Sequence, residues 1–215
     1  MKNKIVTILY VVALTCFALT LSISMPIYCR FFYYLHIDGL NLVETTGYSK
    51  EVIKTAYNEM INYLTLPWAE FSTGALKYSS SGASHFKDVK DLFMLNFGVL
   101  LSSTIVIILL NILNKKGKIS FVKFAGKSPL IYAGIISLVV PIVIGLFAVI
   151  DFESAFDVFH MILFPGKTDW IFSPKTDQII KVLPIEFFAN CGVFIGVTLI
   201  AVAVTYFIFG KKEKA

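Results

Sequence analysis

Two histidine–aspartate pairs are the residues of this chain best suited to proton transfer. His85 and Asp88 stand three residues apart in "SHFKDVKDLF", and Asp157 and His160 stand three residues apart in "DVFHMILF". In a helix, residues at this spacing share one face. A carboxylate beside an imidazole fixes its tautomer and supports its protonated form, so each pair can act as a general base or acid. We therefore predict that His85 and His160 are catalytic and that Asp88 and Asp157 orient them.

Other chemistries for these residues stay open at this point. The four side chains are two imidazoles and two carboxylates, a feasible zinc set, although the sequence has no HExxH-type motif. Serines crowd His85 in "SSSGASH", but no G-x-S-x-G elbow marks a nucleophile. Cys29 has no histidine beside it in sequence, so nothing supports a covalent acyl-enzyme. We expect no metal and no cofactor, and we interpret the third histidine, His36, as an interfacial anchor or a solvated residue.

The elements that must position the two pairs are membrane-spanning helices. The chain has 215 residues, of which 57% are hydrophobic and 15% charged, a composition typical of membrane proteins. Four apolar runs are each long enough to cross about 30 Å of hydrocarbon; they cover approximately 5–27, 92–114, 129–150 and 187–209. None of these runs contains Lys, Arg, Asp, Glu or His, which argues against a pump, channel or transporter.

The placement of lysines orients the predicted spans. The N-terminus, the connector after the second span and the C-terminal tail together carry ten basic residues and one acid, net +9. The other two loops, 28–91 and 151–186, carry nine basic residues and thirteen acids, net −4. Since positive charge gathers on the cytoplasmic side, we predict an α-helical integral membrane protein with both termini inside. The two loops would form a small extracellular cap on a single membrane domain of residues 1–215.

The first outward loop contains one amphipathic stretch. Apolar residues recur at helical spacing over 48–64, with Ser49 as the expected N-cap. This pattern predicts a helix that lies on the outer leaflet or caps the bundle. Turn-forming residues around Thr73 and Gly74 favour a small hairpin. Ser84 is the expected N-cap of the helix that carries His85.

The stretches "SHFKDVKDLF" and "DFESAFDVFHMILFPGKTDWIFSPKTDQIIKVLPIEFF", on a four-span chain of this length, resemble the lipoprotein intramolecular transacylase family of Gram-positive bacteria. The resemblance implies an enzyme that moves the sn-2 acyl chain of a diacylglyceryl-modified lipoprotein to the α-amine of its N-terminal cysteine. The product would be an N-acyl, S-monoacylglyceryl (lyso-form) lipoprotein. The family's two important histidines fall on His85 and His160. We expect His85 to be the base and His160 the acid, and the sequence equally allows the reverse.

The resemblance also sets expectations for partners and location. The partners would be a diacylglyceryl lipoprotein and membrane lipids, with no nucleic acid. The protein would cross the plasma membrane several times, with its active site at the extracellular leaflet. Trp170 and Phe164 are then candidates for lining the lipid path, and Lys90 for meeting a headgroup. Two other functions remain open: a membrane-embedded lipid or ester hydrolase, with or without a metal, and a non-enzymatic envelope accessory protein.

Overall fold

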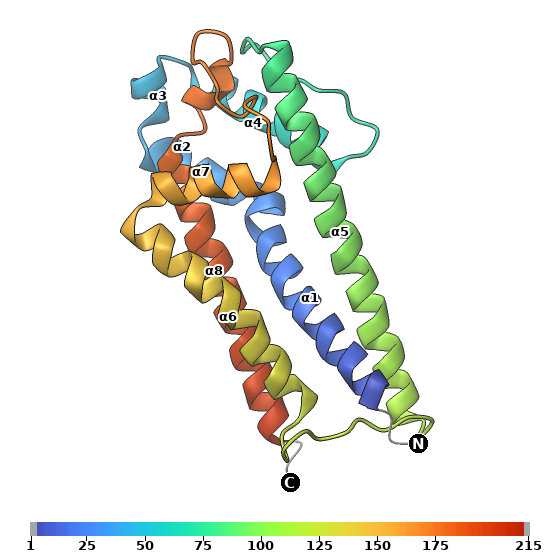
Figure 1. Cartoon of the computed structure of the whole chain (residues 1–215). Helices are drawn as coiled ribbons and strands as arrows, with labels where there is room; N and C mark the ends of the chain where they lie inside the picture. The colour runs from blue at the N-terminus through green and yellow to red at the C-terminus, as the bar shows by residue number, and fades with distance from the viewer. Residues whose placement is uncertain (1–3, 213–215) are drawn as a thin grey trace. The chain divides into compact units, whose positions relative to one another are not determined.

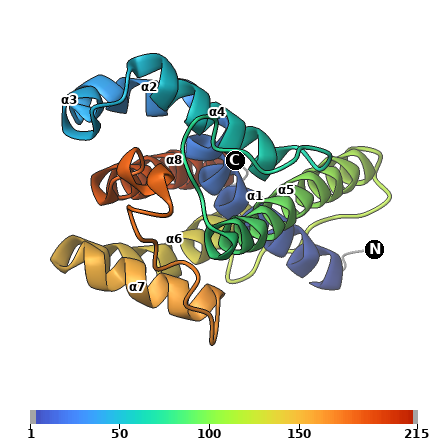
Figure 2. The ribbon, with the colours of Figure 1, turned by 90° about the horizontal axis from the view of Figure 1, so that it is seen from above.

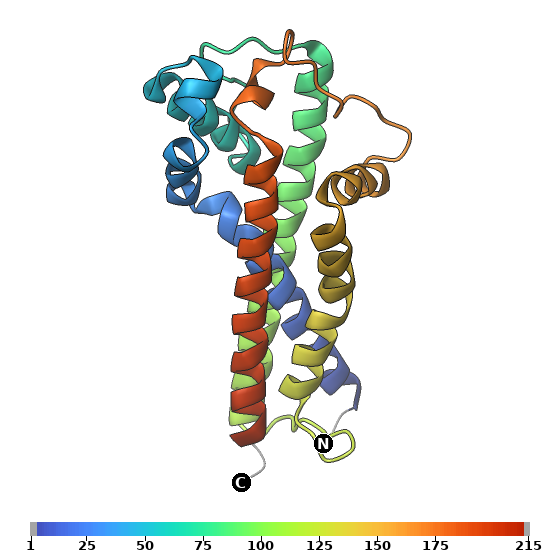
Figure 3. The same ribbon diagram turned by 90° about the vertical axis from the view of Figure 1, so that its left-hand side faces the viewer.

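The helices of this protein form two compact units. A computed structural model of the chain describes residues 4–212, apart from the side chain at position 140. Unit 1 comprises residues 1–25, 96–146 and 193–215, and unit 2 comprises residues 26–95 and 147–192. Figures 1, 2 and 3 show the ribbon from three directions, coloured along the chain.

Four helices are long and apolar enough to cross a membrane. They are α1 (Lys4–Tyr28), α5 (Ser80–Lys115), α6 (Pro129–Ile150) and α8 (Ile185–Lys212). Each contains one of the apolar runs found in the sequence, which confirms an all-helical chain with four long apolar helices. Helix α5 starts well before the predicted span at residue 92, because the charged segment ahead of that span is also helical. Each of the four helices continues from one unit into the other.

Unit 1 is built from the longer parts of these four helices. Its core gathers aliphatic and tyrosine side chains of all four, among them Tyr10, Leu14, Leu110, Ala133 and Leu199. Hydrogen bonds also join the helices: the Tyr206 hydroxyl donates to the Leu14 carbonyl at 3.0 Å. The Asn96 amide donates to the Ser24 hydroxyl at 2.8 Å. Such polar contacts are favoured between helices in lipid, where water cannot satisfy the groups.

Unit 2 has a hydrophobic core of its own. It contains α2 (Arg30–Gly39), α3 (Leu42–Thr46), α4 (Lys50–Thr65), α7 (Phe152–Leu163) and the 3-10 helix η1 (Gln178–Lys181). Tyr33 of α2 stacks on Tyr57 of α4 with ring centroids 3.7 Å apart, and the Tyr33 hydroxyl donates to the Val182 carbonyl at 2.7 Å. Helix α2 lies beside α3 and α4 (Figure 2). Helix α7 runs crosswise to the first turns of α5 and α8 (Figures 1 and 3).

The structure decides between the two positions expected for the amphipathic helix of the first loop. Ser49 is its N-cap, as predicted, and its side chain accepts a hydrogen bond from the Val52 amide. The apolar face of α4 is buried in the core of unit 2, including Ile53, Tyr57 and Ile61. A helix lying on the outer leaflet would turn this face to lipid, so the interfacial position is wrong.

The predicted hairpin is also wrong. Within the described chain, residues 66–79 form turns and extended segments without a strand. Hydrogen bonds from the turn to α4 account for this, because the Glu59 carboxylate accepts from the Gly74 amide at 2.9 Å and from the Ser72 hydroxyl. The Thr73 hydroxyl donates to the Leu76 carbonyl at 2.7 Å within the same turn.

Candidate active site

The two histidines selected from the sequence lie next to each other in unit 2. His85 comes from α5 and His160 from α7, and their ring centroids are 5.6 Å apart. Both rings are almost removed from solvent, with 4% and 7% of their surface exposed. Two imidazoles that are 75 residues apart in sequence thus share one buried site.

His85 is positioned by a helix N-cap that differs from the one predicted from the sequence. Helix α5 begins at Ser80, because the Ser79 hydroxyl accepts a hydrogen bond from the Gly82 amide at 2.9 Å. Ser79 is held in turn by Asp177, whose carboxylate accepts from the Ser79 amide and hydroxyl, both at 2.8 Å. Ser84 therefore lies inside the helix, and its prediction as the N-cap is wrong.

His160 is positioned by α7, a short helix that is capped at both ends. Asp151 caps α7, since its side chain accepts a hydrogen bond from the Ser154 amide at 3.0 Å. His160 lies in the last turn of this twelve-residue helix. The helix ends at Leu163, and the amide of its C-cap residue, Phe164, donates to the His160 carbonyl at 2.8 Å. The short helix thus presents His160 beside the chain reversal that follows it.

Aromatic rings enclose both imidazoles. Phe164 meets His85 edge-on at 4.8 Å between centroids, and Phe172 does so at 5.5 Å. Trp170 stacks on His160 at 4.7 Å. The structure therefore places the predicted residues Phe164 and Trp170 at the site. Phe172 was missed because nothing in its local sequence distinguishes it from the other phenylalanines of the loop.

The hydrogen bond of His160 fixes its tautomer. Its Nδ1 lies 2.8 Å from the Phe156 carbonyl oxygen, which can only accept, so Nδ1 carries the proton. Nε2 of the neutral ring is then a hydrogen-bond acceptor. Burial lowers the pKa of His160 below its ordinary value, and the hydrogen bond to Phe156 and the charge of Asp157 offset this only in part. A backbone carbonyl therefore takes the orienting position that was predicted for Asp157, whose side chain is exposed.

The carboxylate facing His85 is also different from the one predicted. Asp169 lies with Oδ1 3.9 Å from Nδ1 of His85. Both atoms are buried and have no hydrogen-bond partner within the described residues. Asp88 pairs instead with Lys167, at 2.5 Å, and this hydrogen bond raises the pKa of the Lys167 amine. The expected contact from Asp88 to His85 is thus replaced by one from a residue far along the chain.

The remaining predictions for the site concern a headgroup contact and a metal. The Lys90 amine lies 3.2 Å from the Ala69 carbonyl oxygen and 4.2 Å from the centroid of the Tyr63 ring, so it ties the first loop to α5.

Over residues 4–212, no three His, Cys, Asp or Glu side chains are grouped closely enough to hold a metal ion. The four residues of the zinc alternative therefore do not form a ligand set.

Comparisons with known proteins agree with this architecture. Residues 8–188 match the family described as the lipoprotein intramolecular transacylase Lit. The chain belongs to the Lit family. It is therefore an acyltransferase that acts on lipoproteins by an intramolecular reaction. This confirms the resemblance seen in the sequence and favours it over the hydrolase and accessory alternatives.

Solved structures of Lit support the same assignment. The in meso structure of the membrane-integral Lit from Bacillus cereus is 26% identical to the chain, with a TM-score of 0.86 over 97% of this chain and 94% of that one. A variant of the Bacillus cereus protein with a histidine-to-arginine mutation matches with 25% identity and a TM-score of 0.80, over 97% and 90% of the chains. A histidine-to-alanine variant matches with 26% identity and a TM-score of 0.80, over 98% and 94%. No curated protein sequence matches the chain.

The cap of α5 gives a first prediction for stability. Asp177 is buried, and the hydrogen bonds from Ser79 and Thr176 hold its pKa below the ordinary value although burial alone would raise it. Replacing it with alanine leaves the half-buried Ser79 amide without its carboxylate partner, so we expect Asp177→Ala to lower the free energy of unfolding by about 1–3 kcal/mol. Asp38→Ala is the matched control, because Asp38 forms an exposed ion pair with Lys50 that contributes at most about 1 kcal/mol.

Thermal and denaturant unfolding in one detergent would compare these two variants with the unmodified protein. A loss in Asp177→Ala no larger than that in Asp38→Ala would contradict the role of Asp177 as the anchor of the α5 cap.

Proposed function

We propose that the site of His85 and His160 moves the sn-2 acyl chain of a diacylglyceryl-modified lipoprotein to the α-amine of its N-terminal cysteine. The observation that carries this proposal is the pair of buried imidazoles in a member of the Lit family. The ester and the amine belong to one molecule, so a single binding event brings both to the site. Holding them in a reactive pose can supply about 7–11 kcal/mol toward the barrier.

We assign His160 as the residue that accepts a hydrogen bond from the substrate amine. An α-amine has a pKa of about 8 and must be neutral to attack the ester carbonyl. The tautomer of His160 leaves Nε2 as an acceptor, so it can take a hydrogen bond from the amine and hold its lone pair toward the ester. This replaces the predicted role of His160 as a proton donor, because Nδ1 holds the proton of the neutral ring at the Phe156 carbonyl and Nε2, the nitrogen left for substrate, carries none.

His85 is assigned as the residue that moves the proton. As the C–N bond forms, the amine nitrogen gives one proton to His85; as the C–O bond of the sn-2 ester breaks, His85 returns that proton to the leaving alkoxide. The reaction then needs no net exchange of protons with solvent. Asp169, 3.9 Å from Nδ1 of His85, would stabilise the imidazolium that exists between the two steps. This keeps the expected carboxylate support and assigns it to Asp169 instead of Asp88.

The aromatic residues are assigned to the lipid path. Phe164 and Trp170 contact the imidazole rings directly, so an acyl chain bound against them would bring its ester to the histidines. Their contacts support the prediction made from the sequence. Lys90 has carbonyl and aromatic contacts that account for its position, and nothing in them supports a headgroup role.

We further infer that both termini are cytoplasmic and that the site lies at the extracellular leaflet of the plasma membrane. The two units differ in charge, because unit 1 carries ten basic residues and one acid, whereas unit 2 carries nine basic residues and thirteen acids. Positive charge gathers on the cytoplasmic side of a membrane protein. Helix α7 also exposes Phe159, Met161 and Ile162, an apolar surface suited to a helix at the membrane interface. Diacylglyceryl lipoproteins and membrane lipids are then the partners that the site can reach.

Mass spectrometry of a lipoprotein tests the proposal. The protein would be expressed in bacteria that make diacylglyceryl lipoproteins with free N-termini, and the N-terminal lipopeptide of one lipoprotein would be fragmented. Intramolecular transfer changes no mass, so we expect an intact mass equal to the control and fragment ions that place one acyl chain on nitrogen. Loss of an acyl group would indicate a hydrolase instead. An acyl chain still on glycerol, with the enzyme folded and inserted, would overturn the assignment.

A further inference from the structure

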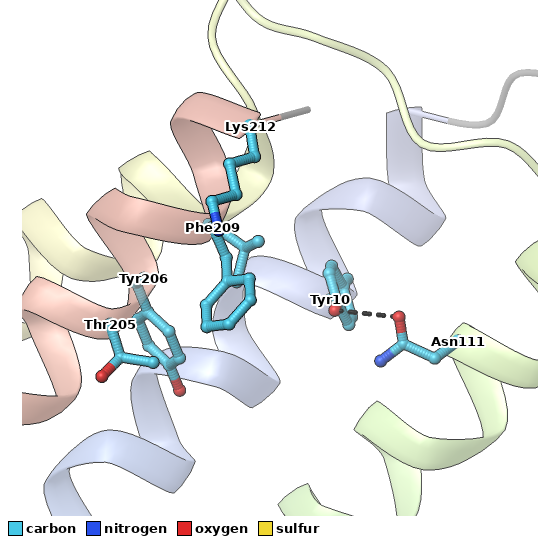
Figure 4. A pocket seen from close by; sticks show the side chains of 7 residues that line it. Tyr10, Asn111, Thr205, Tyr206, Phe209 and Lys212 are labelled. Atoms are coloured by element: carbon cyan, nitrogen blue, oxygen red, sulfur yellow. Dashed lines mark hydrogen bonds between the residues drawn. The ribbon is translucent and has the colours of Figure 1, made fainter. Parts of the chain in front are cut away.

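A cavity of about 570 Å³ lies in unit 1, and the transfer reaction does not use it. All four long helices contribute to its lining (Figure 4). The side chains drawn and labelled there are Tyr10, Asn111, Thr205, Tyr206, Phe209 and Lys212. Its size falls within the range of about 300–1,000 Å³ that is usual for small-molecule sites.

The walls of this cavity are aromatic, and their polar groups are mostly engaged with the protein. The Tyr10 hydroxyl donates to Oδ1 of Asn111 at 3.1 Å, and the Tyr206 hydroxyl donates to the Leu14 carbonyl at 3.0 Å. Lys212 differs from them: its amine lies 5.5 Å from the centroid of the Phe209 ring, and no carboxylate of residues 4–212 pairs with it. An apolar space with a lysine amine at its edge, paired with no carboxylate among the described residues, suits an amphiphilic anion.

The residues around the cavity carry a positive charge, like Lys212 at its edge. The sequence of unit 1 contains ten lysines and one acid. The described lysines lie where helices α1, α5 and α8 begin or end and in the connector that leads into α6, for example Lys4, Lys115 and Lys212. Asn111 lies one turn before the end of α5 and Phe209 one turn before the end of α8, so the cavity lies at these same helix ends. Its surroundings therefore attract anions.

We propose that this cavity binds one anionic phospholipid, with its phosphate beside Lys212 and an acyl chain against Tyr206 and Phe209. Basic pockets between membrane-spanning helices on the cytoplasmic side are suited to anionic lipid headgroups. The aromatic walls distinguish a lipid from free phosphate, because an acyl chain packs against Tyr206 and Phe209 and inorganic phosphate has no group that does. The bound lipid would be a component of the folded enzyme that is separate from the lipoprotein substrate.

Native mass spectrometry of the full-length protein tests this site. The detergent-purified protein would be titrated with phosphatidylglycerol or with phosphatidylcholine, and the lipid retained by the folded protein would be counted. One lysine near an anionic headgroup is worth about a fivefold preference, so we expect one phosphatidylglycerol to be retained about fivefold more tightly than phosphatidylcholine. In Lys212→Gln this preference should disappear. Lys118→Gln is the matched control, since it removes the same charge from the exposed connector without touching the cavity.

A second variant tests the cavity itself. Thr205 is exposed and lines the cavity, so the indole ring in Thr205→Trp should fill the cavity without disturbing the core. We expect this variant to lose its preferential retention of phosphatidylglycerol. Equal retention of the two lipids by the unmodified protein would overturn the proposal. So would an equal loss of preference in Lys212→Gln and Lys118→Gln, which would indicate general electrostatic attraction. Displacement of phosphatidylglycerol by millimolar inorganic phosphate would show a free-phosphate site instead.

Discussion

The His85→Gln variant is expected to form N-acyl lipoprotein about 10²–10⁴-fold more slowly than the unmodified enzyme, which is the usual contribution of a positioned acid–base residue. Glutamine is close in size and polarity to the imidazole, so the aromatic enclosure formed by Phe164 and Phe172 stays filled. It cannot take a proton from the amine and return it to the sn-2 alkoxide. The loss should therefore appear in the rate of transfer, measured by fragment ions of the lipopeptide, and not in insertion or in the unfolding temperature.

His36→Gln is the matched control for this substitution. His36 is also a histidine of unit 2, but it is half-buried and both of its ring nitrogens have partners. Its Nδ1 lies 2.7 Å from the Phe32 carbonyl oxygen and its Nε2 lies 3.0 Å from the Asn190 amide. We expect His36→Gln to keep transfer close to the unmodified rate. Full activity in His85→Gln would remove His85 from the chemistry. Equal losses in both variants would point to damage to unit 2 as a whole.

The parts of the fold that could be predicted are those written in local sequence. The length and composition of the four apolar runs alone predict four long helices. The Ser49 cap is predicted because a serine directly precedes a stretch with helical spacing of apolar residues. The two histidines were found because each has a carboxylate three residues away and the family resemblance includes both stretches. The structure brings them within 5.6 Å of each other, a distance that no spacing within either stretch could give.

The parts that could not be predicted depend on contacts between distant segments. Asp177 caps Ser79 across 98 residues, so the start of α5 could not be read from its own sequence. Asp88 was assigned to His85 by helical spacing, yet Lys167 of the later loop pairs with it. The apolar face of α4 would look the same whether lipid or protein covered it; only the packing of unit 2 shows that protein does. Spacing within a helix identifies candidate partners, and tertiary contacts decide between them.

The second large effect on the transfer rate is expected from substitution of His160. It shows whether His160 accepts a hydrogen bond from the amine or donates a proton. If Nε2 of His160 only accepts a hydrogen bond from the substrate amine, His160→Gln keeps an acceptor oxygen near the same place, whereas His160→Leu keeps none. We expect His160→Leu to lower the rate of transfer by about 10²-fold or more, and His160→Gln to retain much more of it. Fragment ions of the lipopeptide again give the rate. Equal losses in the two variants would contradict the acceptor assignment.

The pH dependence of the rate makes the same distinction. Burial lowers the pKa of His160, so its ring stays neutral as the pH falls toward about 6.5, where a free histidine takes up a proton. The acceptor is then present throughout the neutral range, and the rate should rise with pH through the amine's pKa of about 8 and level off above it. His160→Gln should show the same rise, because the titrating group is in the substrate. A break below pH 6.5 that is present in the unmodified enzyme and absent from His160→Gln would mean that His160 itself gains and loses a proton during transfer, and the two histidines would then exchange the roles assigned to them.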